Sequence, residues 1–273
     1  MSAAPPLTDL ALSRRLERTE GSANAAFVDA RARQSPEVGA VWRDIGGTYA
    51  MFDGVASPLT QTFGLGLFST PTADQLGEIE QFFEERGALV QHEVSPIADP
   101  LLLPLLVERG YHPIELSAVM CQVLPSPPMP PRVDEVALVV RRVTGPDIDT
   151  WADVAARGWC ETPEAAEFVR RMGGVTGRAV GTHTFLVDQD GIPIAAGAMH
   201  VSERVALLAG ASTIPNARKQ GAQGSLLQAR LRYATVQGCD LAMMCALPGS
   251  PSQRNAERRG FRIAYTRIKW SRG

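Results

Sequence analysis

The sequence predicts an α/β protein built from two domains with a similar order of helices and strands. Its 273 residues and 45% hydrophobic content are enough for two packed cores. The segment 125–131 is too rich in proline to continue a helix or a strand, so we expect it to be a linker. It separates residues 1–124 from residues 132–273, and each half contains the order helix, glycine, strand, helix, glycine–aromatic pair, strand.

The elements of the N-terminal half follow from apolar periodicity and from glycine and proline at element ends. Leu76, Ile79 and Phe83 form the apolar stripe of a helix that is expected to begin with Pro71 at its first position and to end at Gly87. The other expected elements are a strand over 89–94, a helix begun by Asp99-Pro100, the pair Gly110-Tyr111 and a strand over 114–124.

The C-terminal half shows the same signals over a longer stretch. Asp190-Gly191 between two alternating runs predicts a hairpin turn. The expected elements are strand 136–143, helices 146–158 and 162–172, strands 182–188, 192–201 and 205–211, helix 222–236, strand 241–246, a short helix before Gly260 and strand 263–270. The separation of the paired glycines is 23 residues from Gly87 to Gly110 and 22 from Gly238 to Gly260, which indicates duplicated domains.

The segment between strand 205–211 and helix 222–236 predicts an anion-binding site. A strand, a short loop containing glycine and a helix leave several backbone N–H groups free to point at one anion. Arg218 and Lys219 lie at the mouth of this loop, so the anion is expected to be a phosphate or pyrophosphate. The loop is neither a Walker loop, because no Gly-Lys-Ser or Gly-Lys-Thr occurs, nor a dinucleotide fingerprint, because no glycine lies two residues before Gly221.

Arg218-x-x-Gly221-x-Gln223, followed by Leu226-Leu227, resembles the acyl-CoA pyrophosphate loop of the GNAT superfamily of N-acyltransferases. That family has Gly or Ala where this chain has Gln223. The longer side chain of Gln223 narrows the space through which a phosphate reaches the loop. A short helix ending in Gly260-Phe261 and followed by a strand resembles the second motif of the family. The resemblance extends from about residue 135 to the C-terminus.

The resemblance implies two GNAT-like domains, each a mixed, mostly antiparallel sheet flanked by helices. It also implies direct transfer of an acyl group, most simply acetyl from acetyl-CoA, to an amine of a small molecule or peptide, without a metal. The N-terminal copy has Pro71 and Asp74 where the anion loop would be, so only the C-terminal copy is expected to bind CoA. The N-terminal copy either lines one side of the acceptor site or serves as a dimerisation or stability module.

The CoA-binding residues that the resemblance implies lie on the strand end, the loop and the second motif. Alternatively, the Ser212 hydroxyl faces solvent, and Asn255 caps and starts its own helix. The full set is Ala211, Ser212, Thr213, Arg218, Lys219, Gln220, Gly221, Ala222, Gln223, Gly224, Ser225 and Asn255.

The groups that move protons are less defined than the loop. The family often has a tyrosine four residues before the glycine of the Gly-Phe pair, and this chain has Ala256 there. Tyr265 is a candidate acid in its place, unless it is a core residue. Glu161, in the turn between two helices, and His200, at a strand end, are candidate bases, since an alkylammonium must lose a proton before its nitrogen can attack.

Composition excludes several other classes. The net charge of −2 gives no reason to expect nucleic acid, and no long apolar run predicts a membrane span or a secretory signal, so a cytoplasmic monomer or homodimer is expected. A non-catalytic acyl-CoA-binding or interaction protein is the alternative to an enzyme. A serine hydrolase is disfavoured, because Ser250 and Ser252 do not lie in a Gly-x-Ser-x-Gly motif.

Overall fold

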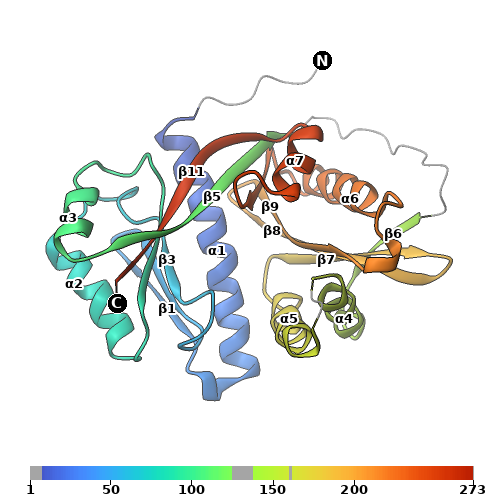
Figure 1. Ribbon diagram of the computed structural model, residues 1–273, viewed down its shortest axis with the longest axis horizontal. Helices are drawn as coiled ribbons and strands as arrows, with labels where there is room; N and C mark the ends of the chain where they lie inside the picture. The colour runs from blue at the N-terminus through green and yellow to red at the C-terminus, as the bar shows by residue number, and fades with distance from the viewer. Residues whose placement is uncertain (1–7, 125–137, 160–161, 273) are drawn as a thin grey trace. The chain divides into compact units, whose positions relative to one another are not determined.

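A computed structural model describes residues 8–124, 138–159 and 162–272 (Figure 1). The chain divides into two compact units, of which unit 1 comprises Met1–Val123 and Met243–Gly273 and unit 2 comprises Leu124–Ala242. The expected linker 125–131 lies outside the described residues. The units differ from the expected halves in one respect, because residues 243–273 were expected in the C-terminal domain and cluster with the N-terminal one.

Unit 1 is a sheet with helices on both faces. Its strand order is β1-β2-β3-β4-β11-β5, with β3 and β4 parallel and the other pairs for which a register is given antiparallel. The elements are α1 (Leu10–Gln34), η1 (Pro36–Val38), β1 (Val41–Ile45), β2 (Thr48–Phe52), β3 (Gln61–Phe63), α2 (Ala73–Glu84), β4 (Val90–Val94), α3 (Leu102–Glu108), β5 (His112–Val123), α7 (Pro251–Arg258) and β11 (Arg262–Arg272). A further strand, β10 (Leu241–Ala246), crosses the boundary between the units.

The last strand of the chain completes the sheet of unit 1. β11 lies between β4 and β5, where Ile268 faces Val94 on one side and Leu116 on the other. Trp270 of the same strand is buried in the core beneath α2 and α3. Because periodicity identifies a strand but not its neighbours, this pairing could not be predicted from the sequence.

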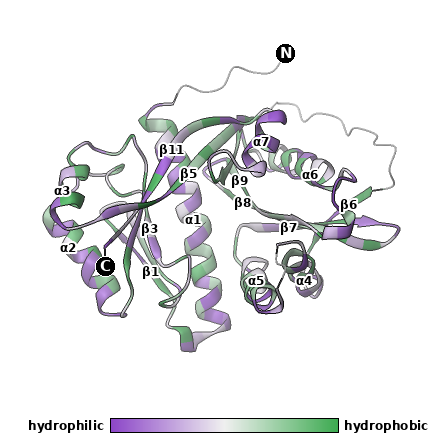
Figure 2. Cartoon of the chain, viewed as in Figure 1, coloured by the Kyte–Doolittle hydropathy of each residue, from purple (hydrophilic) through white to green (hydrophobic). Residues whose placement is uncertain are grey.

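The two faces of the unit 1 sheet carry separate cores, as the alternation of β2 requires. Ala50 and Phe52 pack in the cluster that contains α2 and α3, whereas Met51 packs in the cluster that contains α1. Helix α1, capped by the Asp9 side chain, was not predicted from the sequence. Hydrophobic and hydrophilic residues are interspersed along its length, so its apolar stripe is interrupted (Figure 2).

The predicted glycine ends of the helices are confirmed. Gly87, Gly110, Gly238 and Gly260 all have positive φ, and the residue after each donates its N–H to the carbonyl five positions back. The predicted start of α2 is wrong by two residues. Thr72 caps that helix through its side chain, so Pro71 lies before the cap.

Unit 2 is an antiparallel sheet of order β9-β8-β7-β6, and the element order predicted for this half is confirmed. Figure 1 shows α4 and α5 on one face of the sheet and α6 on the other. Its elements are β6 (Leu138–Val143), α4 (Asp147–Trp159), α5 (Pro163–Thr176), β7 (Thr182–Gln189), β8 (Ile192–Ser202), β9 (Val205–Thr213), η2 (Pro215–Ala217) and α6 (Ala222–Val236). Among the described residues, no helix is both long enough and apolar enough to cross a membrane.

A buried ionic cluster ties α1 to the sheet of unit 1. The Arg267 guanidinium, 2% exposed, lies 2.8 Å from Glu20, 3.2 Å from Glu17 and 2.9 Å from Glu93. Burial raises the pKa of Glu17 to about 7, against the opposing effect of Arg267. This carboxyl is therefore harder to ionise in the folded chain than in the unfolded chain.

The pH dependence of stability tests this cluster. Because the pKa of Glu17 rises from 4.5 to about 7 on folding, its stabilising contribution is fully present below pH 4.5 and is lost as pH rises through 7. We expect the free energy of unfolding of Glu17→Gln, relative to wild type, to rise by about 3 kcal/mol across that window. Urea denaturation of both proteins across this pH range measures the difference in free energy of unfolding, with Glu37→Gln as an exposed control. Parallel stability profiles for Glu17→Gln and wild type would contradict it.

Candidate functional site

The site is built where β9 passes through η2 into α6. Lys219 has φ 66° and Gly221 has φ 88°, so the chain turns through the left-handed region twice before the helix begins. Gly221 is the N-cap of α6 and makes no side-chain cap. Glycine adopts this conformation without steric cost, which explains its place at the start of the helix.

The loop presents backbone donors without acceptors. Gly224 and Ser225 donate to the Gly221 carbonyl at 2.9 and 3.1 Å. Within the described parts of the chain, no acceptor lies within hydrogen-bonding distance of the N–H groups of residues 219–223. Residues 218–221 and Gln223 are exposed, so these donors and the positive end of α6 are open to a ligand.

Two side chains of the loop hold it against the end of β9. Arg218 donates from Nε to the Thr213 carbonyl at 3.3 Å and from Nη2 to the Gly158 carbonyl at 3.1 Å. Gln223 donates from Nε2 to Thr213 Oγ1 at 2.7 Å. The Gln223 side chain is thus turned toward β9, which gives a structural reason for the residue that departs from the family pattern.

Ser212 is engaged in packing. Its side chain is buried and its Oγ donates to the Ala155 carbonyl of α4 at 3.0 Å, so the expectation of a solvent-facing hydroxyl is wrong. A Cβ at Gly158 would collide with the Ser212 side chain, so glycine is required at this point of α4. Only the backbone of Ser212 remains for a ligand.

An irregular stretch of β9 lies just before the loop. Ala196 of β8 faces Ser212 and Ala198 faces Ala209, so Gly210 and Ala211 together oppose the single residue Gly197. This is a β-bulge, and Gly210 has φ 60°. Ala209 and Gly210 are exposed and Ala211 is half-buried, whereas the residues on either side of them are buried. The middle of β9 is therefore accessible.

The histidine expected as a base lies on β8 in unit 2. His200 is 8% exposed, and its Nδ1 lies 3.4 Å from the Thr182 hydroxyl. Burial, with a smaller effect of His183, lowers the pKa of His200 to about 4. The imidazole is neutral at physiological pH, but its weak basicity makes it a poor acceptor of an ammonium proton.

The other candidate residues lie in unit 1 or outside the described residues. Tyr265 lies on β11 in unit 1, where its buried OH donates to Glu17 Oε1 at 2.9 Å, and burial raises its pKa well above the ordinary value. Asn255 is an exposed residue of α7, also in unit 1, and accepts from Arg258 at 3.3 Å. Glu161 lies outside the described residues.

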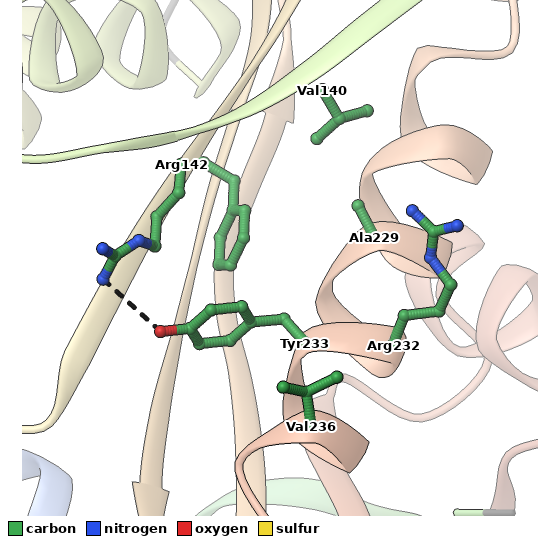
Figure 3. Close-up of a pocket in the computed structure, with 7 residues that line it drawn as sticks. Val140, Arg142, Ala229, Arg232, Tyr233 and Val236 are labelled. Carbon is green, nitrogen blue, oxygen red and sulfur yellow. Dashed lines mark hydrogen bonds between the residues drawn. The ribbon is translucent and has the colours of Figure 1, made fainter. Parts of the chain in front are cut away.

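Two cavities lie in unit 2. One, of about 380 Å³, is lined by the end of α4, by the start of α5 and by the start of η2 beside the loop. The other, of about 450 Å³, lies between β6 and the second half of α6. Figure 3 shows Tyr233 directed toward Arg142, to which it is hydrogen-bonded at 3.4 Å, while Arg232 leaves α6 away from Tyr233. Because the second cavity is lined far along α6 from Gly221, the first is the one adjoining the loop.

Sequence reasoning missed the most buried polar side chain near the bulge. Arg230 is 4% exposed and donates from Nη1 to the Ala198 carbonyl at 2.9 Å. The helical pattern of the sequence places Leu227, Leu231 and Ala234 on one face of α6, and of these only Ala234 belongs to the buried set, which is Ala222, Leu226, Arg230 and Ala234. Their spacing of four residues was a usable signal, although it places a charge on the buried side.

Comparisons with known proteins identify solved structures of similar fold. No family model matches the sequence, and no curated protein matches it. The structure is similar to a GCN5-related N-acetyltransferase from Kribbella flavida, with a TM-score of 0.62, 18% identity and coverage of 90% of this chain and 95% of that one. It is also similar to a GCN5-related N-acetyltransferase from Sphaerobacter thermophilus, with a TM-score of 0.54, 15% identity and coverage of 100% and 95%.

A third similar structure is described as a tandem GNAT protein from the clavulanic acid biosynthesis pathway. The TM-score is 0.55 and the identity 14%, with coverage of 82% of this chain and 78% of that one. At these identities the likeness is one of fold. The similarity extends over most of both chains, so it includes both units.

The protonation of His200 can be measured directly. Because burial lowers its pKa to about 4, we expect the ring resonances of His200 to titrate with a midpoint near that pH and to remain those of a neutral imidazole above it. A pH series of histidine-selective NMR spectra measures this, with His200→Gln assigning the signal. A midpoint at the ordinary value of 6.5 would show that the side chain is hydrated.

Proposed function

Because the chain has the fold of GCN5-related N-acetyltransferases, we propose that it is an acyl-CoA-dependent N-acyltransferase, with acetyl-CoA as the donor and a small-molecule or peptide amine as the acceptor. The observation that carries this proposal is the run of N–H groups over residues 219–223 at the start of α6, which have no acceptor among the described residues and of which all but that of Ala222 belong to exposed residues. A diphosphate is the part of acyl-CoA that such donors bind best.

The parts of acyl-CoA match consecutive features of unit 2. The pyrophosphate accepts from the loop amides and faces the positive end of α6, with Lys219 adding a charge at the mouth. The pantetheine arm then runs along the accessible stretch of β9 at Ala209–Ala211. There it hydrogen-bonds to the strand backbone, as an added strand would. The acyl thioester thereby comes to the β-bulge.

The reaction needs no covalent intermediate with the protein. The amine lone pair attacks the carbonyl carbon of the thioester, and the π electrons move to the oxygen. When this oxyanion collapses, the C–S bond breaks and its electron pair leaves with sulfur. The nitrogen loses a proton and the thiolate gains one, giving the amide and free CoA. Backbone N–H groups at an irregular strand are suited to hold the oxyanion.

The acceptor cavity is the one beside the loop. Its 380 Å³ are lined by Arg157, Thr162, Pro163, Ala166, Ile214, Pro215 and Asn216. Hydrogen bonds from Arg218 and Ser212 hold the end of α4 against β9 beside this cavity. An acceptor bound in the cavity therefore lies next to the end of β9, the strand that holds the thioester. A cavity of this volume suits a small amine or a single side chain.

We propose that unit 2 alone binds the donor. The corresponding helix of unit 1, α2, begins with Thr72, whose side chain already accepts from the Gln75 N–H. Asp74 follows in the first turn and repels a diphosphate. At the start of α2, therefore, one backbone donor is already used by the Thr72 side chain and the first turn carries a negative charge.

A second candidate function is binding of acyl-CoA without turnover. It is favoured by the buried bond of Tyr265 to Glu17, by the weak basicity of His200 and by Ala256 at the position where the family often has a tyrosine. Release of free thiol from acetyl-CoA in the presence of a panel of amines separates the two functions. Tight binding with no thiol released by any amine supports the second.

Replacing Gly221 by aspartate tests the loop. A carboxylate placed at the anion cradle should weaken acetyl-CoA binding about 10- to 100-fold, because like charges at close range cost about 1.5–3 kcal/mol at the protein surface. Gly221→Asn is the matched control, since it imposes the same backbone strain at φ 88° without the charge. Titration calorimetry with acetyl-CoA measures both variants.

The comparison of the two variants is decisive. Asparagine should weaken binding much less than aspartate, and the difference should shrink as salt is added. Equal heats for wild type and Gly221→Asp, or equal losses for Asp and Asn, would remove the electrostatic basis of the proposal.

A further inference from the structure

Arg230 is a buried cation without a carboxylate partner. It points from α6 into the sheet of unit 2, and no described Asp or Glu lies within ion-pair distance of it. Within the described segments, its guanidinium bonds only to backbone carbonyls, those of Ala198 at 2.9 Å, Ala209 at 3.4 Å and Leu226 at 3.4 Å. Burial alone lowers its pKa to about 10, so it remains charged at neutral pH.

These bonds are made at the β-bulge. Ala198 and Ala209 are the facing pair on one side of it, so Arg230 joins the two strands at the point where their register shifts. Gly197 lies under the guanidinium, and a Cβ there would be 3.3 Å from Arg230 Cζ and 2.8 Å from Leu226 Cδ2. Glycine is needed for this approach.

The bulge is also held from the other face of the sheet. Trp151 of α4 donates from Nε1 to the Gly197 carbonyl at 3.2 Å. Figure 1 shows α4 and α6 on opposite faces, so the irregular stretch is clamped between a tryptophan and an arginine. An apolar side chain could fill the space at either position. Burying an unneutralised charge instead costs several kcal/mol of folding free energy. The charge therefore requires a separate explanation.

We propose that Arg230 is a positioning residue for acyl transfer, which fixes the β8–β9 bulge through two carbonyls and favours the negative charge that develops on the thioester oxygen held there. This inference rests on the proposed function, since it assigns the acyl group of acyl-CoA to the bulge. In a buried site of low polarity an uncompensated cation acts over several ångströms. The charge acts on the transition state more than on the neutral thioester, so it raises the rate more than the affinity.

The matched pair Arg230→Lys and Arg230→Gln separates charge from hydrogen bonding. Both side chains can donate to the two carbonyls, but only lysine keeps the charge. With acetyl-CoA and any amine that the wild type accepts, we expect Arg230→Gln to lower kcat about 10- to 100-fold while the Kd for CoA stays within about threefold. Arg230→Lys should retain most of the activity. Arg232→Gln, at a half-buried position of the same helix that lines the other cavity, is the control and should match wild type.

A second readout does not need turnover. Infrared difference spectra of bound acetyl-CoA report the polarisation of the thioester carbonyl, and we expect its stretching frequency to be lower in wild type and Arg230→Lys than in Arg230→Gln. If Arg230→Gln does not fold, as judged by circular dichroism and thermal melting, Arg230→Met provides the neutral comparison. Failure of both neutral variants to fold, with Arg230→Lys showing an unpolarised carbonyl, would assign Arg230 to stability alone and overturn the proposal.

The other outcomes are equally clear. Equal kcat values for folded Arg230→Gln and wild type, or a loss of CoA affinity as large as the loss of rate, would overturn the proposal. If wild type does not bind acetyl-CoA at all, the proposed function fails first, and the Gly221 variants identify that failure separately.

Discussion

The site depends on one backbone turn, the passage from β9 into α6 through two left-handed residues. A helix that starts from such a turn has unpaired N–H groups at its first positions, and no acceptor among the described residues satisfies them. The turn keeps this form because Arg218 and Gln223 fasten it to Thr213, and Arg218 also reaches the end of α4. The side chains thus organise the loop, and its backbone N–H groups are left for the anion that we propose.

Two buried arginines show how differently a charge is used in the two units. Arg267 is surrounded by three carboxylates and joins α1 to the sheet of unit 1, which makes it a structural group. Arg230 has only carbonyl partners in the part of the chain that the structure describes, and it lies at an irregular pair of strands in unit 2. A neutralised cluster stabilises a fold at modest electrostatic cost, whereas an unneutralised cation is costly and is better explained by an anion that forms during function.

The loop and its helix were predictable because they depend on local chemistry. The bounds of α6, the hairpin turn at Asp190-Gly191 and the glycine ends of four helices follow from glycine geometry and short-range periodicity, and the structure confirms them. The roles of Ser212 and Tyr265 could not be read in this way. Their hydroxyls donate to Ala155 and Glu17, which are 57 and 248 residues away in the sequence. Helix α1 was missed because the polar residues Ser13, Glu17 and Thr19 on its buried face interrupt the apolar stripe.

By itself, then, the sequence determined the order of the elements from β6 onward, the glycine-containing loop before α6 and the resemblance that the fold bears out. These are properties of segments of a few residues, where steric limits on φ and ψ and the spacing of apolar residues decide the outcome. Only the tertiary structure decided that β11 pairs between β4 and β5, that Gln223 turns toward β9 and that Arg230 lies against Gly197. Each of these depends on contacts between residues distant in the chain, which are selected by packing and by the pairing of buried polar groups.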